Sequence, residues 1–586
     1  MGGLGSALDI ARSALNVQRY GLEVTAHNIA NVNTPGYSRQ SPMLTAKPPE
    51  PFGGVILGHG VDLTNVTRAG DRFIEKRLMD QKSGMASSGE MENYMKILEG
   101  VFNEDPETGM SAMLSRFWNL WQDVANNPSG TPERVALLQH GVFLSERFNS
   151  LDSDLAALER ELTGSIGVGI QSVNELTAQI ADLNARIARM ELQGDANDLR
   201  DKRNEVLSNL SEYLDVNAFE QSDGSLTVVA ARGCVLVQGN NSYDLELGGD
   251  NSDRVRWQAS GGSTVDITNY IGKGKLAGWL DMRDEIIAKY KRDLSTVAKE
   301  FIWIINRQHS QGVGAHAFSA VTGEYTASDR TVELADQGSG LDFFDKIKDG
   351  TFNLWVYAPD GTPIGGAPSV ITIDADPGGT TLEGLATAID AVSNINAAVT
   401  ADGRFSIQAD SGYTFAFSRD DSNVLAALGI NTFFSGAGSG GMAMGEEVTS
   451  DTRLIAAAQV GSDGRFAPGD NTNALAISGL QYTSMDIARW SCDRVNGNSE
   501  ERVTATIESY YHAMVGHMGV TSSGISRERA MNEEMVKRLG DIRDSISAVS
   551  LDEEMTNLIK YQHAYQAASK LVTVSDEMLD TLLSMK

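Results

Sequence analysis

The sequence has few cysteines, which form the disulfides of small secreted domains, and it has no long apolar segment of the kind that spans a membrane. Among 586 residues there are only 2 cysteines, Cys234 and Cys492, and neither belongs to a CxxC motif or lies near a histidine. They predict two buried thiols and give no basis for a disulfide framework or a zinc site. No segment approaches 18 consecutive apolar residues, so no membrane-spanning helix is expected. Hydrophobic residues make up 41% of the chain, which is enough for several folded cores.

Basic residues are also scarce. The chain holds 48 Lys and Arg against 78 Asp and Glu, a formal net charge of −30. This charge repels nucleic acid phosphates and anionic lipids, so neither nucleic acid nor a membrane is expected as a partner. The acidity is uneven, because residues 341–450 hold 14 acidic and 4 basic side chains, whereas residues 1–50 hold 3 and 4. The nearly neutral N-terminal end packs more easily against copies of itself.

Signals for secretion and catalysis are missing as well. The N-terminus has no basic segment followed by an apolar one, so no Sec-type signal peptide is expected, and composition alone favours the cytoplasm. There is no HExxH, GxSxG or P-loop motif. A GxGxxG match at 436–441 opens no helix and indicates flexibility. Adjacent carboxylates at 553–554 and 420–421 do not converge and are expected on solvated faces. We therefore expect no enzyme, no cofactor and no metal site.

The N-terminal segment carries a heptad pattern instead. Its apolar and small residues alternate spacings of four and three, with two polar positions near the end. The positions are Leu4, Leu8, Ala11, Leu15, Gln18, Leu22, Thr25 and Ile29. A helix is expected over about 4–31. It should end at Asn33-Thr34-Pro35-Gly36, because proline disfavours a helical preceding residue and glycine tolerates positive φ.

The C-terminal segment repeats the pattern. Asp576 interrupts it, and Ser550 with Glu553 forms a capping-box signature at its start. The positions are Leu551, Met555, Leu558, Gln562, Tyr565, Ser569, Val572, Leu579 and Leu583. A lone helix cannot bury such a stripe, so the two ends are expected either to pair with each other or with neighbouring copies, or to pack on an ordinary core. Both terminal helices are expected to be disordered in the monomer.

Between the ends the sequence predicts a multi-domain α+β fold, in which an elongated α-helical rod from both halves of the chain carries inserted β-rich domains. The strongest helical stripe is 173–190, and further helices are expected at 275–309 and 498–545. The expected segments are 1–40, the N-terminal helix and its motif; 41–215, the first part of the rod; 216–270, β-rich; 271–312, a rod helix; 313–450, a β-rich or α+β outer domain; 451–549, the second part of the rod; and 550–586, the C-terminal heptad helix.

Turn signals mark the strand-rich parts. Asp-Gly pairs at 223–224, 360–361 and 402–403 separate runs of β-branched and aromatic residues. Short helices are expected near 381–393 and 422–428. The Gly- and Ser-rich residues 435–445 predict a solvated loop or linker that includes Ser439.

Residues 28–40, NIANVNTPGYSRQ, resemble the N-terminal signature of the flagellar axial proteins, which comprise rod, hook and hook-associated proteins. Residues 550–579, SLDEEMTNLIKYQHAYQAASKLVTVSDEML, resemble their C-terminal segment. The resemblance implies that the two terminal helices form an inner tube around an export channel. The residues expected at the assembly interface are Leu4, Leu8, Leu15, Leu22, Asn28, Ile29, Asn31, Pro35, Gly36, Tyr37, Leu551, Met555, Leu558, Tyr565, Val572 and Leu579.

Three interior stretches, 197–216, 272–312 and about 380–435, resemble the hook-associated proteins of the hook–filament junction rather than hook or rod proteins. Trp303 and the isoleucines at 304–305 depart from the smaller or polar residues expected there, which affects local packing only. This resemblance implies a structural subunit outside the cell, exported by the flagellar type III pathway.

The implied partners are copies of the chain in a ring, the hook protein, the second junction protein FlgL, and a cytosolic export chaperone on the C-terminal helix. Two alternatives stay open: a hook or rod-type axial protein, and a secreted adhesin or binding module. An enzyme carried on an axial scaffold would need a converging site in the middle domains.

Overall fold

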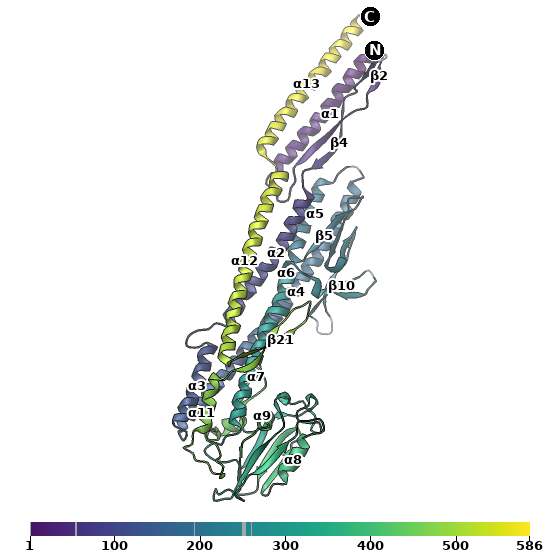
Figure 1. The fold of residues 1–586 in the computed structure, drawn as a ribbon. Coiled ribbons are helices and arrows are strands. Elements are labelled where there is room, and N and C mark those ends of the chain that lie inside the picture. The colour runs from purple at the N-terminus through teal and green to yellow at the C-terminus, as the bar shows by residue number, and fades with distance from the viewer. Residues whose placement is uncertain (1, 53–54, 193, 249–252, 260, 586) are drawn as a thin grey trace. The chain divides into compact units, whose positions relative to one another are not determined.

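The chain folds into two compact units, each assembled from segments that are far apart in the sequence. The computed structural model describes residues 2–52, 55–192, 194–248, 253–259 and 261–585. The first unit contains residues 1–94, 162–282 and 523–586, and the second contains 95–161 and 283–522. Long helices and several small sheets make up both units (Figure 1). The predicted multi-domain α+β fold is therefore confirmed.

Three long helices contribute residues to both units: α2 (Arg72–Val101), α4 (Thr131–Met190) and α12 (Ile507–Ser547). The remaining elements of the first unit are α1 (Gly2–Ala30), β1 (Gln40–Ala46), β2 (Glu50–Phe52), β3 (Val55–Leu57), β4 (Val61–Arg68), α5 (Asn197–Tyr213), β5 (Val216–Glu220), β6 (Leu226–Ala230), β7 (Cys234–Gln238), β8 (Asn241–Ser242), β9 (Leu245–Gly248), β10 (Arg254–Gln258), β11 (Thr264–Asp266), α6 (Gly274–Asp281) and α13 (Leu551–Ser584).

The first unit attaches two of its sheets, β5-β6-β7-β8 and β11-β10-β9, to the second half of α4. The predicted stripe is helical and largely buried, with Val173, Ile180 and Ile187 fully buried and only Met190 exposed. The buried amide of Asn184 donates to the carbonyl oxygens of Leu226 and Gly239 and accepts from the Leu226 N–H, all within 2.9 Å. This asparagine therefore fixes the antiparallel sheet β5-β6-β7-β8 to the helix.

The second unit combines helices with two three-stranded antiparallel sheets, ordered β14-β13-β17 and β12-β16-β15. Its other elements are α3 (Met110–Asn126), a π-helical segment (Met282–Ile287, whose first residue belongs to the first unit), α7 (Ala288–His309), β12 (Ala320–Thr326), β13 (Gly350–Tyr357), β14 (Ser369–Ile373), α8 (Leu382–Asp390), β15 (Ile395–Val399), β16 (Arg404–Ala409), β17 (Thr414–Ser418), α9 (Val424–Leu428), β18 (Phe434–Ser435), β19 (Ala443–Met444), α10 (Glu446–Ser450), α11 (Thr472–Gly479), β20 (Met485–Ser491) and β21 (Ser499–Ala505).

Aromatic side chains form the core of the second unit. The ring of Phe117 on α3 lies 5.3 Å from that of Phe301 on α7 and 5.9 Å from that of Phe433. Trp303, where the sequence departs from its expected family pattern, stacks on Phe343 with a centroid distance of 5.4 Å. The departure thus adds a packing contact in the core.

A buried histidine ties the end of α7 to two loops of this unit. The Nε2 atom of His309 accepts a hydrogen bond from the Ala456 N–H at 2.9 Å, so Nδ1 carries the proton and donates to the Asn431 carbonyl at 2.8 Å. Burial lowers the pKa of His309 to about 4. The ring is therefore neutral in the folded chain at neutral pH.

Away from the two terminal helices, the structure differs from the sequence-based expectations in four places. The helix expected over 275–309 is present, but its hydrogen-bond pattern changes to that of a π-helix at Met282–Ile287, where Met282 and Ile287, five residues apart, are both fully buried. Residues 499–505 are strand β21 rather than helix, paired with β20. The expected exposure of Ser439 was wrong, because Ser439 is fully buried and donates to Asp152 at 2.7 Å, although its segment is a loop and Gly440 and Gly441 beside it are exposed. Asp420 is buried, not solvated, and its carboxylate accepts from the backbone N–H groups of Ser422, just before α9, and of Leu425 in its first turn.

The His309 hydrogen bonds predict a specific loss of stability in mild acid. Between the unfolded pKa of about 6.5 and the folded pKa of about 4, only the unfolded chain binds the proton, so stability is complete above this window and falls as pH is lowered through it. The loss should reach about 2 kcal/mol at pH 5. Urea denaturation of the wild type and of His309→Gln from pH 7 to 5 measures it. The variant should show a shallower pH slope, whereas the exposed His512→Gln control should keep the wild-type slope.

Candidate assembly interface

The two chain ends form an antiparallel helix pair within the first unit. Helix α1 descends from the N-terminus while α13 returns toward the C-terminus beside it (Figure 1). Gly21 lies against the ring of Tyr561, and seven residues further along α1 Asn28 donates to Glu554, seven residues earlier in α13. Of the arrangements that the heptads leave open, the structure thus shows pairing of the ends with each other.

Small side chains line the seam between these helices. Ala11, Gly21 and Thr25 are buried on α1, and Ala568 and Ser575 are buried on α13. Small residues allow the two backbones to approach closely, but they remove little apolar surface from water. The pair is consequently held by less hydrophobic free energy than a leucine-lined coiled coil of the same length.

The predicted apolar stripes lie only partly in this seam. Half-buried positions are Leu8, Leu15, Leu22, Ile29, Leu558, Val572 and Leu579. Leu551 and Met555 are each 49% exposed and Tyr565 is 40% exposed, while the side chain of Leu4 falls outside the described part of the structure. The sequence predicts that positions 555, 562 and 569 of α13 face α1. In the structure the buried or half-buried positions are instead 554, 561, 568 and 575, each one residue away from the predicted series. A hydrophobic pattern misses these positions because they contain Glu, Ala and Ser.

Large apolar side chains of α13 consequently remain exposed. They occur along most of the helix, each with 40% or more of its surface accessible: Leu551, Met555, Ile559, Tyr565, Leu571, Val574, Met578 and Leu583. Exposed apolar surface of this extent is typical of a protein–protein contact region.

The segment after α1 turns back along the predicted motif. Gly36 has φ +77°, the left-handed conformation that the sequence predicts, and Pro35 is exposed. Asn31 Nδ2 donates to the His27 carbonyl at 3.0 Å, and the Thr34 hydroxyl donates to Asn31 Oδ1 at 3.1 Å. Asn31 therefore closes the end of the helix, and the chain is redirected toward Tyr37.

Asn28 is the centre of a fully satisfied polar cluster. Its Oδ1 accepts from the Tyr37 hydroxyl at 2.8 Å and from the Gln40 N–H at 2.9 Å. Its Nδ2 donates to the Gln40 carbonyl at 2.8 Å and to Glu554 Oε2 at 3.0 Å. All four hydrogen-bonding capacities of the buried amide are used, which fixes its orientation. Burial, then the charges of Asp198, Asp201 and Glu554, raise the pKa of Tyr37, so its hydroxyl remains a donor.

Arg39 completes the cluster from the same loop. Its Nε donates to Glu554 Oε1 at 2.9 Å and its guanidinium contacts Glu553 at 2.6 Å, while its N–H donates to the Ser547 carbonyl at the end of α12. Glu554 is only 1% exposed. The expectation that this glutamate is solvated was therefore wrong. The capping box was wrong too, because Ser550 makes no side-chain cap and Glu553 pairs with Arg39.

Further contacts join the motif to the start of α5. The N–H and hydroxyl of Ser38 donate to the buried carboxylate of Asp201 at 2.8 and 3.0 Å, and Arg68 on β4 donates to it at 2.7 Å. Gln40 donates to Asp198 at 2.7 Å. The motif thus binds α5, α12 and α13 at once, which explains the polar residues within it.

Sequence reasoning identified Asn28, Gly36 and Tyr37 but missed Arg39, Asp201 and Glu554. Asn28 and Glu554 are separated by 526 residues, so no local pattern links them. The one local signal was the arginine inside the motif, because a guanidinium forms strong hydrogen bonds with a carboxylate where the two are brought together.

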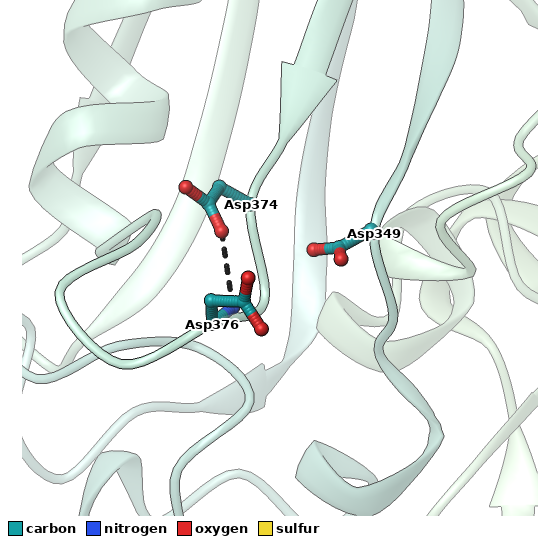
Figure 2. Close-up of side chains that lie close together, drawn as sticks. All are labelled: Asp349, Asp374 and Asp376. Carbon is teal, nitrogen blue, oxygen red and sulfur yellow. Dashed lines mark hydrogen bonds between the residues drawn. The ribbon is translucent and has the colours of Figure 1, made fainter.

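Other groups in the described residues offer no comparable site. Asp349, Asp374 and Asp376 place carboxylate oxygens within 4.8 Å of one another, and all three are exposed. The Asp376 N–H donates to Asp374 at 3.0 Å (Figure 2), and the Ala375 N–H donates to Asp349 at 2.8 Å, so loop geometry explains the group. Cys234 and Cys492 are buried free thiols, as predicted. Among the described residues, no helix has the length and apolar character that crossing a membrane requires.

Three family models match the chain, at the ends and in the middle. Residues 8–37 match the flagella basal body rod protein model, and residues 544–585 match the C-terminal model of the flagellar basal body rod FlgEFG proteins. Residues 95–321 match the helical domain of flagellar hook-associated protein FlgK. The two terminal matches contain most of α1 and all of α13, the helices that pair in the structure.

Relatives match over the whole length. Flagellar hook-associated protein 1 of Bacillus subtilis is 25% identical, with 98% of this chain and 97% of that protein covered. Its counterparts from Salmonella typhimurium and Escherichia coli are 25% and 22% identical over 100% of both chains. This chain belongs to the flagellar hook-associated protein family.

A solved structure agrees with the fold. The flagellar hook junction protein FlgK from Burkholderia pseudomallei superposes with a TM-score of 0.52 at 16% identity, covering 80% of this chain and 100% of that one. Like its hook-associated relatives, the chain is a structural component of the bacterial flagellum. The family resemblance seen in the two terminal motifs is thereby confirmed.

The thin seam predicts that the chain ends have the lowest local stability. In the isolated monomer, residues 1–35 and 550–586 should be cleaved first in limited proteolysis, because small side chains stabilise α1 and α13 only weakly. The stripe at 173–190 in α4 is the internal control and should survive in the remaining core. Mass spectrometry of the fragments identifies the cut sites. Resistance of both ends in a chain shown to be monomeric by light scattering would contradict the prediction.

Proposed function

We propose that this chain is a non-enzymatic junction subunit that joins the flagellar hook to the filament and assembles through α1 and α13. The observation that carries the proposal is the composition of the helix pair. Apart from Tyr561 and the polar pair of Asn28 and Glu554, the buried positions of its inner seam are small residues, whereas large apolar side chains of α13 are exposed in the single chain. Such a pair is incomplete alone and gains stability when neighbouring subunits cover its outer surface.

The proposed interface has an inner and an outer part. The inner part comprises the motif residues Asn28, Asn31, Pro35, Gly36 and Tyr37, which orient α1 and α13 within one subunit. The outer part comprises the exposed side chains, led by Leu551, Met555 and Tyr565. The half-buried residues connect the two parts: Leu8, Leu15, Leu22, Ile29, Leu558, Val572 and Leu579, together with Leu4.

Copies of this chain in a ring are the first proposed partners, since the same helix pair recurs in every subunit. The hook protein on one side and FlgL on the other are the next, as the family resemblance implies. We further propose that the chain is exported to the cell exterior through the flagellar type III pathway, and that a cytosolic chaperone covers α13 before export. An exposed apolar helix would otherwise associate with unrelated surfaces.

A charge on the outer surface of α13 tests the proposal. Met555→Asp should leave the isolated chain folded, because this side chain is 49% exposed, yet it should place a carboxylate in the contact between subunits. An unpaired buried charge costs several kcal/mol per subunit, and a ring repeats that cost. Cells should carry hooks and release unpolymerised flagellin. Electron microscopy and a melting curve of the purified variant measure both effects.

Two further variants separate the causes. Gln566→Asp, an exposed polar position of α13, is the control and should leave motility intact. Leu558→Asp lies in the half-buried row and should also weaken the helix pair itself. Variant protein in the culture supernatant indicates failed assembly, whereas variant protein retained in the cell indicates failed chaperone recognition or export. Normal filaments on Met555→Asp cells would disprove the proposed interface.

A further inference from the structure

We infer that two adjacent layers of the α1–α13 seam act as a register lock, which selects one antiparallel alignment of the helices. The lock comprises Gly21 and Asn28 on α1 and Tyr561 and Glu554 on α13. Both pairs are seven residues apart on their helices, so they occupy successive heptad layers.

The first layer is polar and requires hydrogen-bond donors at fixed positions. Glu554 is 1% exposed, and its two carboxylate oxygens accept from Asn28 at 3.0 Å and Arg39 at 2.9 Å. Asn28 cannot rotate to serve another partner, because Tyr37 and Gln40 occupy its oxygen. A carboxylate buried at this depth is tolerated only where these donors are already in place.

The second layer is steric. A Cβ atom at Gly21 would lie 2.7 Å from the Cδ1 and Cε1 atoms of Tyr561, closer than side chains can approach. Any other residue at position 21 would have to displace the ring. Glycine at this one position therefore provides the space into which the tyrosine packs.

The small residues of the neighbouring layers do not discriminate between registers, and the half-buried leucines of α1 recur every seven residues, so a shift by one heptad places leucine where leucine was. One heptad further along each helix lie Ala14 and Ala568, and the next buried position of α13 is Ser575. Contacts between alanine and serine are nearly interchangeable, because they bury similar small areas and have no shape to match. Without the lock, the helices could slide by a heptad at little cost.

Sliding by one heptad moves α13 by about 10 Å along α1. In one direction, Tyr561 meets the Cβ of Ala14, and Glu554 meets Gly21, which has no side-chain donor. In the other direction, Tyr561 meets Asn28 and Glu554 passes beyond the end of α1. Both slipped registers leave the carboxylate unpaired and a large ring without space, so each should be disfavoured by roughly tenfold or more.

The register decides which exposed side chains of α13 lie beside which side chains of α1. Its role in assembly rests on the proposed function, since neighbouring subunits would contact this combined surface. The alignment itself is a property of the single chain and can be measured without any assembly.

Disulfide trapping in the purified full chain tests the lock. Cys234 and Cys492 are first replaced by alanine, and cysteine pairs are then introduced that report three alignments. The pairs are Ala14→Cys with Ala568→Cys for the native register, and Ala14→Cys with Ser575→Cys or Ala7→Cys with Ala568→Cys for the two slipped registers. Rates of intramolecular disulfide formation under mild oxidation are followed by mass spectrometry. Trapping also captures helix pairs that form only transiently.

With the lock intact, the native pair should form its disulfide roughly ten times faster or more than either slipped pair. Asn28→Leu with Glu554→Leu removes the buried carboxylate together with its donor on α1, and Tyr37, Gln40 and Arg39 lose the hydrogen bonds that they make to these two residues. Tyr561→Ala removes the steric layer. Each change should reduce the preference, and all three together should make the rates equal. Gln562→Leu, at an exposed position beside Tyr561, is the matched control and should keep the preference.

A preserved preference in the triple variant would overturn the inference, as would equal rates with the lock intact. If the triple variant forms none of the three disulfides, the four residues hold the helices together rather than select their register, and the inference also fails. None of these results bears on whether subunits assemble through α13. Filaments on cells that carry Met555→Asp address that question separately.

Discussion

The carboxylate of Glu554 can be buried only because donors from two other segments surround it. Asn28 comes from the end of α1 and Arg39 from the turn that follows, so burial of this one group requires the motif loop to be in place. The loop is in turn held by Asp201 and by the end of α12. Because each contact depends on the others, the chain ends, α5 and α12 form one cooperative polar core in the first unit.

This arrangement separates specificity from affinity. A buried ion pair contributes little net stability compared with apolar packing, but it makes wrong alignments costly. The apolar side chains that could supply affinity are exposed on α13, where they cannot stabilise the single chain. The helix pair is therefore specific but weak, whereas the aromatic core of the second unit is extensively packed around Phe117 and Phe301.

The sequence predicted those features that depend on local patterns. Both terminal helices, the positive φ of Gly36 and the 173–190 stripe follow from spacing and turn chemistry. Long-range polar pairing could not be predicted, because Glu554 resembles any charged residue near a helix start. The buried positions of α13 were predicted one residue away from where they lie for a related reason. Close approach of two helices favours small residues, whereas periodicity rules search for large apolar ones. The burial of Ser439 depends on Asp152, 287 residues away, and is equally invisible.

A polar lock has an advantage over an apolar seam, because it prevents the terminal helices from pairing with other helices or in other registers. An apolar heptad seam pairs with many other apolar helices, in either direction and in several registers, because hydrophobic contacts are not directional. A buried carboxylate beside a glycine space accepts only a helix that offers both features seven residues apart. The inferred lock restricts the pairing of the chain ends to a single alignment, while large apolar side chains of α13 stay exposed for the neighbouring subunits that we propose. In the inferred arrangement specificity comes from four residues, and the remaining surface of the helix pair stays accessible for the proposed assembly.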